Sequence, residues 1–180
     1  RNSSQNIQPI LTQAKKSDYS AIWSSQIPDS PAPIARAAQC YVYDPQTNKI
    51  IIAYGMDNHT SYLNDCWALD LSTLTWSLLN SELLSPRCYA SAILITSLPT
   101  REMFIFGGYN GYKYFSDLHS INLETGQITR YDINVSPRQS AILFSSPTSL
   151  FIYSGFNGNE LRSFSEFNLQ THECTNSEVT

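Results

Sequence analysis

The sequence has little charge and no long apolar run. Lys, Arg, Asp and Glu make up 14% of its 180 residues, and the formal net charge is −4. A protein that binds nucleic acid or an anionic membrane needs a basic surface, which this composition does not supply. The most apolar stretches, such as Ile50–Ala53 and Ala92–Ile95, have the length of a strand. A membrane span needs roughly 18 apolar residues. We therefore expect no nucleic-acid partner and no membrane span.

Cysteine pairs and catalytic motifs are also missing. The four cysteines form no CxxC pair: Cys40, Cys66, Cys88 and Cys174. Buried, reduced thiols in a cytoplasmic protein are predicted in preference to two disulfides. No nucleophile elbow, phosphate-binding loop or HExxH motif occurs, so we expect no catalytic residue, no metal ligand and no cofactor. The first residue is Arg1 rather than Met, which leaves a preceding signal peptide open.

The sequence does contain an internal repeat. Arg36, Arg87 and Arg138 are separated by 51 residues each time. Three tetrads share the pattern Asp or Asn, Leu, any residue, Thr, and they are Asp70–Thr73, Asn122–Thr125 and Asn168–Thr171. A hydrophobic residue lies six positions after the first residue of each tetrad: Trp76, Ile128 and Cys174. Matched offsets of this kind indicate a repeat.

Each repeat has the pattern of four short strands. In the second repeat the predicted strands are Tyr89–Ile95, Met103–Phe106, Leu118–Leu123 and Gln127–Asp132. Pro45, Pro99 and Pro147 fall between the first two strands of the three repeats, where a missing N–H costs no ladder hydrogen bond. Four strands per repeat, with a glycine after an apolar strand, are typical of a propeller blade.

Two segments resemble a known family. Phe104–Gly108 (FIFGG) and Leu63–Trp76 (LNDCWALDLSTLTW) are similar to kelch repeats, and the likeness covers residues 33–176. Only the second repeat keeps the double glycine, since the first has Tyr54–Gly55 and the third has Ser154–Gly155. The chain resembles the kelch-repeat β-propeller family, of the stand-alone type rather than the BTB-linked type. The resemblance implies an all-β fold, a partial β-propeller with three four-stranded kelch blades.

Kelch propellers close with more than three blades, so we expect the remainder of the propeller outside this chain. Trp23 lies 13 residues before Arg36, much as Trp76 lies 11 before Arg87. Trp23 is therefore predicted to mark the outer strand of a preceding blade. The expected domains are an N-terminal extension with that strand at 1–32, kelch repeat 1 at 33–84, repeat 2 at 85–135 and repeat 3 at 136–180.

One face of the blades is the candidate binding surface. The loops 56–62, 109–114 and 156–160 and the connectors 81–86 and 134–137 should emerge together, and we call them the loop face. In closed kelch domains this is the usual partner-binding surface, as the resemblance implies. The predicted partner-binding residues are Asp57, Asn58, His59, Tyr62, Asn110, Tyr112, Lys113, Tyr114, Asn157, Asn159 and Glu160. Tyrosines give contact area at little entropy cost, although loops are polar in any protein, and for each residue that alternative stays open.

Other repeated residues are predicted to be structural. The three arginines should brace loops by donating to carbonyl groups, with ligand binding as the alternative. Trp67 and Trp76 are expected to pack between blades. The complete predicted structural set is Arg36, Gly55, Trp67, Trp76, Arg87, Gly107, Gly108, Arg138 and Gly155.

The predicted function is that of a non-catalytic scaffold or adaptor for protein–protein interaction. We expect it within a cytoskeletal or trafficking assembly, in the cytoplasm or on the cytoskeleton. A substrate receptor of a ubiquitin ligase is the alternative, which a BTB domain upstream would favour. A copper-radical oxidase is a remote alternative, because His59, His119 and His172 occupy different strand contexts, one per repeat, and do not easily converge on one ion.

Overall fold

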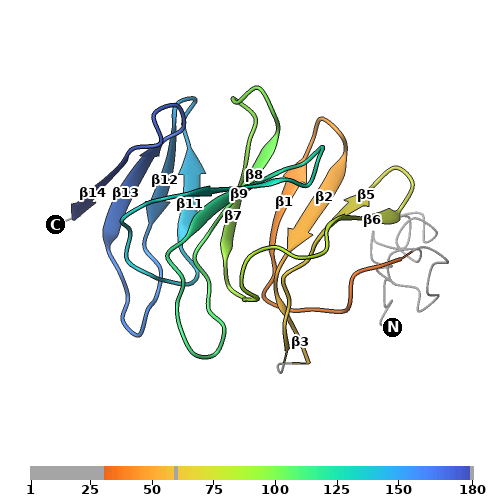
Figure 1. The fold of residues 1–180 in the computed structure, drawn as a ribbon, viewed down its shortest axis with the longest axis horizontal. Helices are drawn as coiled ribbons and strands as arrows, with labels where there is room; N and C mark the ends of the chain where they lie inside the picture. Colours follow the sequence, from red (N-terminus) through yellow and green to blue (C-terminus); the bar gives the residue numbers. More distant parts are fainter. Residues whose placement is uncertain (1–30, 59–60, 179–180) are drawn as a thin grey trace, which may run out of the picture. The chain divides into compact units, whose positions relative to one another are not determined.

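A computed structural model describes residues 31–58 and 61–178, and in this part of the chain the regular elements are all strands. Three four-stranded antiparallel sheets follow one another along the sequence (Figure 1). Each sheet corresponds to one of the three repeats, which confirms the prediction of all-β blades. Trp23 and the strand predicted around it lie outside the described residues.

The three sheets are simple meanders. The first contains β1 (Cys40–Asp44), β2 (Lys49–Ala53), β5 (Cys66–Asp70) and β6 (Thr75–Asn80). The second contains β7 (Ser91–Ile95), β8 (Glu102–Phe106), β9 (Leu118–Asn122) and β10 (Ile128–Tyr131). The third contains β11 (Ile142–Ser145), β12 (Ser149–Tyr153), β13 (Ser163–Asn168) and β14 (Cys174–Glu178). In the second repeat the predicted strand ends agree with these bounds to within two residues.

A small fourth sheet was not expected from the sequence. The strands β3 (Met56–Asp57) and β4 (Ser61–Tyr62) pair antiparallel within the second-to-third loop of the first repeat. The backbone N–H of Ser61 donates to Oδ1 of Asp57 at 3.0 Å. Two residues per strand are too few for a hydrophobic periodicity to show, so this hairpin could not be predicted from the sequence pattern.

The tetrads close the last hairpin of each sheet. Asp70, Asn122 and Asn168 each end the third strand, and each accepts a hydrogen bond through Oδ1 from the N–H two residues on, at 2.8, 2.9 and 2.9 Å. The N–H three residues on donates to the same oxygen atoms. A short polar side chain at this position therefore sets the turn, which explains why Asp or Asn recurs there.

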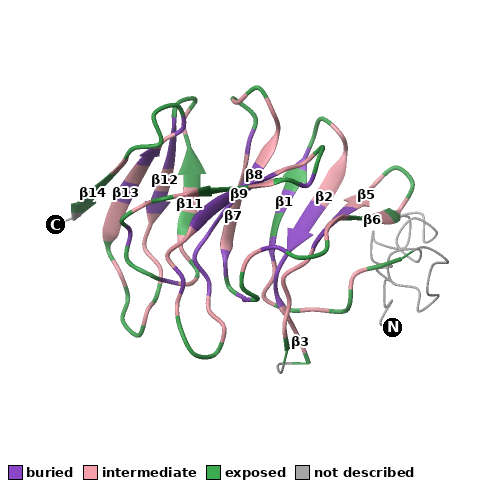
Figure 2. Ribbon diagram, viewed as in Figure 1, coloured by how far each residue is buried: buried purple, intermediate pink, exposed green. Residues whose placement is uncertain are grey.

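The second sheet is buried on both faces. On β8, Met103 and Ile105 belong to the core shared with the first sheet, whereas Phe104 and Phe106 belong to the core shared with the third. All four side chains are at most 1% exposed. The neighbouring sheets are buried less evenly. Figure 2 shows buried segments on β2 of the first sheet and on β12 of the third, and exposed segments on β11 and β14 of the third. The apolar run Met103–Phe106 has no alternation because both sides of this strand face other sheets.

The first and third sheets each have a face turned away from the second. On β1, Tyr41 and Tyr43 are 67% and 49% exposed, and the strand register places them on the same face as Trp67. On β11, Ile142 and Phe144 are 54% and 42% exposed. The Phe144 ring stacks on Phe151 of β12 at 5.0 Å between centroids and lies 6.1 Å from Phe164 of β13. We call Ile142, Phe144, Phe151, Tyr153 and Phe164 the Phe144 face.

Backbone hydrogen bonds join successive repeats at equivalent positions. The N–H of Tyr89 donates to the carbonyl of Ala38, and the N–H of Ser140 donates to that of Tyr89, both at 2.9 Å. Ala38, Tyr89 and Ser140 are 51 residues apart, and all three have a positive φ near 55°. The same local conformation thus recurs where each repeat meets the next.

Candidate partner-binding site

The loop face is assembled at one end of the sheets. The loops after β2, β8 and β12 extend toward the same side, opposite the turns that join the first two strands of each sheet (Figure 1). Antiparallel bridges tie the start of each repeat to the beginning of its loop, joining Ala37 to Met56, Cys88 to Tyr109 and Gln139 to Phe156. The loops are therefore held at a fixed position relative to their sheets.

A row of aromatic side chains runs across the three loops. Tyr109 and Tyr114 lie 4.8 Å apart between ring centroids, and Tyr114 meets Phe156 of the third repeat at 6.2 Å. Tyr62 of the first repeat reaches Gly111, where an added Cβ would come within 2.8 Å of the Tyr62 hydroxyl. We call Tyr62, Tyr109, Tyr114 and Phe156 the aromatic row. It joins the three loops into one surface, because each loop contributes a ring that contacts its neighbour.

Gly111 is the residue that permits this contact. Its φ is +88°, a conformation that side chains with a Cβ rarely adopt, and the space for a Cβ is taken by Tyr62. Burial raises the pKa of Tyr62, with smaller contributions from the Cys88 thiol and then from the hydroxyls of Tyr109 and Tyr112. The Tyr62 hydroxyl therefore stays neutral more readily than that of a free tyrosine.

The remaining predicted residues of the second loop are unevenly placed. Tyr112 is 96% exposed. Asn110 accepts hydrogen bonds through Oδ1 from the backbone N–H of Tyr112 and of Lys113, at 3.2 and 3.0 Å, so its side chain shapes the turn. The Lys113 ammonium lies 5.0 Å from the centroid of the Phe115 ring. Tyr112 is thus the side chain of this loop most available to a partner.

The first and third loops contribute less. Asp57 accepts the Ser61 N–H and is engaged in the β3–β4 hairpin, and the adjacent Asn58 has a φ of 33°. His59 lies outside the described residues. In the third loop Asn159 and Glu160 are exposed, and the N–H of Asn157 donates to the Asn159 carbonyl at 3.2 Å. The structure brings Tyr62 and Tyr114 into the aromatic row, and an antiparallel backbone bridge joins Glu160 to Phe156 of that row.

Tyr109 and Phe156 were missing from the predicted site. Both lie at the edges of the predicted loops, directly after the glycine-ended strands, where a structural role was the natural interpretation. The signal that was available is the recurrence of a bulky residue after that glycine, namely Met56, Tyr109 and Phe156. All three residues form the bridge to the start of their repeat.

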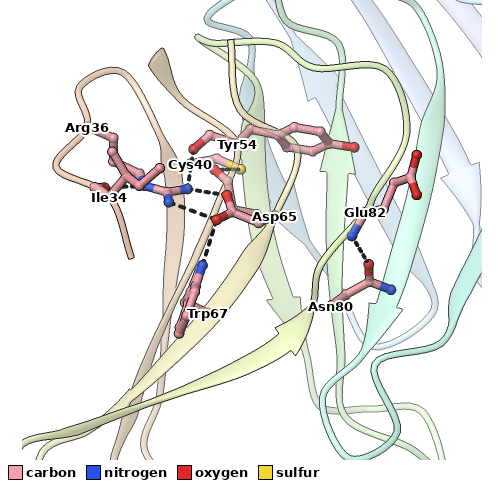
Figure 3. Close-up of polar contacts among 9 residues, drawn as sticks. Ile34, Arg36, Cys40, Tyr54, Asp65, Trp67, Asn80 and Glu82 are labelled. Carbon is pink, nitrogen blue, oxygen red and sulfur yellow. Dashed lines mark hydrogen bonds and ion pairs between the residues drawn. The ribbon is translucent and has the colours of Figure 1, made fainter. Parts of the chain in front are cut away.

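The repeated arginines occupy equivalent positions beneath these loops. Arg36 donates through Nε to the carbonyl of Ile34 at 3.1 Å and through its terminal nitrogens to both carboxylate oxygens of Asp65, at 2.6 and 3.0 Å (Figure 3). The indole N–H of Trp67 donates to the same carboxylate at 2.6 Å. Burial alone would raise the pKa of Asp65, but the hydrogen bonds from Arg36 and Trp67 outweigh it and hold that pKa below its usual value.

Arg87 makes the corresponding contacts in the second repeat. It donates to the carbonyls of Ser85 and Gly107 and to Oδ1 of Asp117, at 2.9, 3.0 and 2.7 Å. Its guanidinium lies 3.8 Å from the centroid of the Phe115 ring, an attractive cation–π contact. Arg87 is 1% exposed, and its charge is held inside the protein by the Asp117 carboxylate and by two aromatic rings, since the Tyr54 ring also lies 5.1 Å from the guanidinium. The arrangement braces the loops, and the ion pair neutralises the guanidinium.

A buried polar chain continues from Asp117 into the first repeat. His119 of β9 is fully buried, its Nδ1 is 3.4 Å from Oδ2 of Asp117, and its Nε2 is 2.8 Å from the hydroxyl of Tyr54. Burial lowers the pKa of His119, although Asp117 opposes the shift. When the neutral ring carries its hydrogen on Nδ1, toward Asp117, the Tyr54 hydroxyl donates a hydrogen bond to Nε2. His119 therefore links two repeats, and it has no opening to the loop face.

The described residues contain no cluster of metal-ligating side chains and no thiol with a lowered pKa. Within residues 31–58 and 61–178, no group of three or more His, Cys, Asp or Glu side chains is placed to hold a metal ion. The four cysteines are unpaired, and burial raises the pKa of Cys40 to about 12 and that of Cys88 to about 11. These thiols are poor nucleophiles near neutral pH. In the same part of the chain no helix is long and apolar enough to cross a membrane.

Repeated four-stranded meanders, joined side by side with their loops on one face, define a protein of the β-propeller class. Residues 16–180 match the KLHDC2/KLHL20/DRC7 Kelch-repeats domain, and the chain belongs to the kelch-repeat family. Domains of this family are generally non-enzymatic and serve protein interaction.

Two curated proteins of Arabidopsis thaliana are similar to part of the chain. Acyl-CoA-binding domain-containing protein 4 is 30% identical over 115 residues, which are 62% of this chain and 16% of that protein. Acyl-CoA-binding domain-containing protein 5 is 32% identical over 99 residues, which are 55% of this chain and 15% of that protein. The matched part of the chain therefore covers less than a fifth of the length of these relatives.

Proposed function

We propose that the chain is a non-catalytic scaffold or adaptor whose loop face binds another protein. The observation that carries this proposal is the aromatic row, which joins the loops of three repeats into one surface. Beside it lies the almost fully exposed Tyr112. Protein interfaces are enriched in aromatic residues, and an exposed tyrosine loses little rotamer entropy when it is buried by a partner.

The cellular setting belongs to the same proposal. We place the protein in the cytoplasm, within a cytoskeletal or trafficking assembly, because the LNDCWALDLSTLTW segment has the style of stand-alone kelch proteins. The alternative, a ubiquitin-ligase substrate receptor, would use the same loops to hold its substrate. Both hypotheses require a protein bound at the loop face, so the identity of that protein distinguishes the scaffold from the substrate receptor.

The test is cross-linking mass spectrometry on the native, full-length protein in cell extract, comparing wild type with Tyr112→Ala. Gln170→Ala, an exposed residue in the hairpin turn of the third sheet, is the matched control. We expect Tyr112→Ala to reduce the recovery of partner peptides linked to Lys113 by about tenfold, corresponding to roughly 1.4 kcal/mol. Gln170→Ala should leave the recovery unchanged.

The proteins recovered in this experiment distinguish the scaffold hypothesis from the substrate-receptor hypothesis. Cytoskeletal or trafficking proteins linked to Lys113 would support the scaffold, whereas a cullin-type ligase would support the substrate receptor. Partners that cross-link equally to wild type and Tyr112→Ala would contradict the role of the loop face. Because the Tyr112 side chain is so exposed, the substitution should leave the melting temperature unchanged, and a fall in melting temperature would identify a folding defect.

A further inference from the structure

The third repeating arginine has the same backbone contacts as the first two. Arg138 donates through Nε to the carbonyl of Ser136 at 3.0 Å and through a terminal nitrogen to the carbonyl of Ser154 at 2.9 Å. Arg36 and Arg87 make the same two contacts. Each donates to the carbonyl two residues earlier and to the carbonyl of the residue just before the glycine that follows the second strand, which is Gly55, Gly108 or Gly155 in the three repeats. The guanidinium of Arg138 is therefore fixed in the same orientation.

The carboxylate that pairs with this arginine is replaced in the third repeat. Asp65, Asp117 and Ser163 are equivalent, because the carbonyl of each accepts the N–H of the residue that directly follows the second strand of its sheet, at 3.1, 3.2 and 3.4 Å. The first two side chains form ion pairs with Arg36 and Arg87. A serine at the third position leaves the carboxylate out and leaves its space available.

The consequence is a buried positive charge without an ion pair among the described residues. Arg138 is only 1% exposed, and burial lowers its pKa. The Ser163 hydroxyl is also buried and has no hydrogen-bond partner in the described part of the chain. A buried charge and a buried hydroxyl are both costly when unsatisfied, so two polar groups at one place have unused hydrogen-bonding capacity.

These two groups line a cavity of about 630 Å³ between the second and third repeats. Its wall includes Ser116 from the second repeat and Ser165 and Asn176 from β13 and β14. Among the described residues that line the cavity there is no Asp, Glu or Lys, and the guanidinium of Arg138 is the one charged group of that set. The Ser165 hydroxyl already donates to Oδ1 of Asn176, and the Asn176 amide donates to the carbonyl of Asn134. The volume is within the range of small-molecule pockets, and an anion entering it would meet the arginine and the Ser163 hydroxyl, which has no partner among the described residues.

We propose that this cavity is a carboxylate-binding site, filled by an acidic side chain of the bound partner. The incoming carboxylate takes the place that Asp65 and Asp117 fill in the other repeats and pairs with the Arg138 guanidinium. The cavity adjoins the connector 134–137, which belongs to the loop face, so a protein on that face can insert a side chain. The partner as the source rests on the proposed function, whereas the carboxylate site does not.

The first experiment measures the melting temperature of the full-length protein in sodium acetate and in sodium chloride at equal ionic strength. We expect acetate to raise the melting temperature of wild type relative to chloride, because a ligand that binds the folded state stabilises it. Ser163→Asp should melt higher than wild type in chloride and should not respond to acetate, since its own carboxylate fills the site. Ser163→Asn, a neutral residue of similar size, is the control for the added bulk.

A separate control addresses a carboxylate from the chain itself. The backbone register places Glu178 of β14 opposite Ser163. If acetate stabilises Glu178→Gln but not wild type, the chain supplies its own carboxylate and the proposal is wrong. The proposal also fails if acetate has no effect on wild type, or if it stabilises wild type and Ser163→Asp equally.

The second experiment tests the partner as the source, using the cross-linking assay described above. Ser163→Asp should reduce partner recovery about tenfold while leaving the fold intact, and Tyr112→Ala should leave the acetate response unchanged. If Ser163→Asp abolishes the acetate response but partner recovery is unaffected, the partner does not supply the carboxylate, and this part of the proposal is overturned. Failure of the loop face and failure of the carboxylate site therefore give different results.

Discussion

At the scale of single residues, His119 should make stability depend on pH. Its pKa is lowered from 6.5 in the folded protein, so the unfolded chain binds a proton that the folded protein excludes. Well above pH 6.5 the His119 ring is neutral in both the folded and the unfolded state, so it does not make the free energy of unfolding depend on pH. As pH falls below 6.5, the unfolded state gains protons first, and the free energy of unfolding decreases. The lowered pKa of Asp117 adds loss of the same sign only at much lower pH.

We predict a decrease in the free energy of unfolding between pH 7 and pH 5, which His119→Gln should reduce. Urea titrations of the full-length protein at each pH measure it. Tyr54→Phe is the companion variant, because it removes the hydroxyl that Nε2 accepts and leaves the titrating ring in place. We expect it to lose about 1–2 kcal/mol at pH 7 while retaining the pH dependence. Parallel pH curves for wild type and His119→Gln would rule out this role for the histidine.

The residue pattern predicted some of these positions and not others. The arginine spacing of 51 was visible in the sequence, and so was the Asp or Asn of each tetrad. Each of these residues makes the same hydrogen bonds to nearby backbone in every repeat, so its position recurs. The contact between Tyr54 and His119 was not visible, since the two residues are 65 positions apart and belong to different repeats. The ion pairs to Asp65 and Asp117 were likewise missed, although the Asp in LND and FSD recurs in the sequence.

At the scale of elements, the end of β12 carries backbone strain that can be relieved. Ser154 has a φ of 61°, whereas the equivalent residue of the second repeat, Gly107, has a φ of 69°. The left-handed region costs a residue with a Cβ roughly 1–2 kcal/mol relative to glycine. We predict that Ser154→Gly raises the free energy of unfolding by about 0.5–1 kcal/mol, because glycine also increases the entropy of the unfolded chain.

The reverse substitution, Gly107→Ser, serves as the control. An added Cβ at Gly107 would clash with the carbonyl oxygen of Arg138, so a side chain there must displace the backbone of the next repeat. We expect a loss larger than the gain from Ser154→Gly, measured by the same urea titrations. Equal and opposite effects would mean that φ alone, and not the close approach, distinguishes the two positions.

At the scale of the whole molecule, the sequence predicted the blades but not how their faces differ. The offsets of the repeats were enough to infer three four-stranded sheets, because each strand and turn has its own local signal. Burial of both faces of β8 depends on two neighbouring sheets, and the alternation of Met103 and Phe104 between them cannot be read from a uniformly apolar segment. The aromatic row depends in the same way on loops that meet only in space.

The Phe144 face leads to a prediction about the isolated chain. A blade face is normally covered by the next blade, and burying a phenylalanine contributes roughly 1.5–3 kcal/mol. With Phe144 and Ile142 42% and 54% exposed, residues 1–180 expressed alone should self-associate, which sedimentation velocity would detect. Phe144→Ser should shift the distribution toward monomer with little change in melting temperature, whereas Phe104→Ser, in the core, should unfold the protein. A monomeric wild-type chain with a sharp, cooperative melt would contradict the prediction and show that three blades suffice without a covering partner.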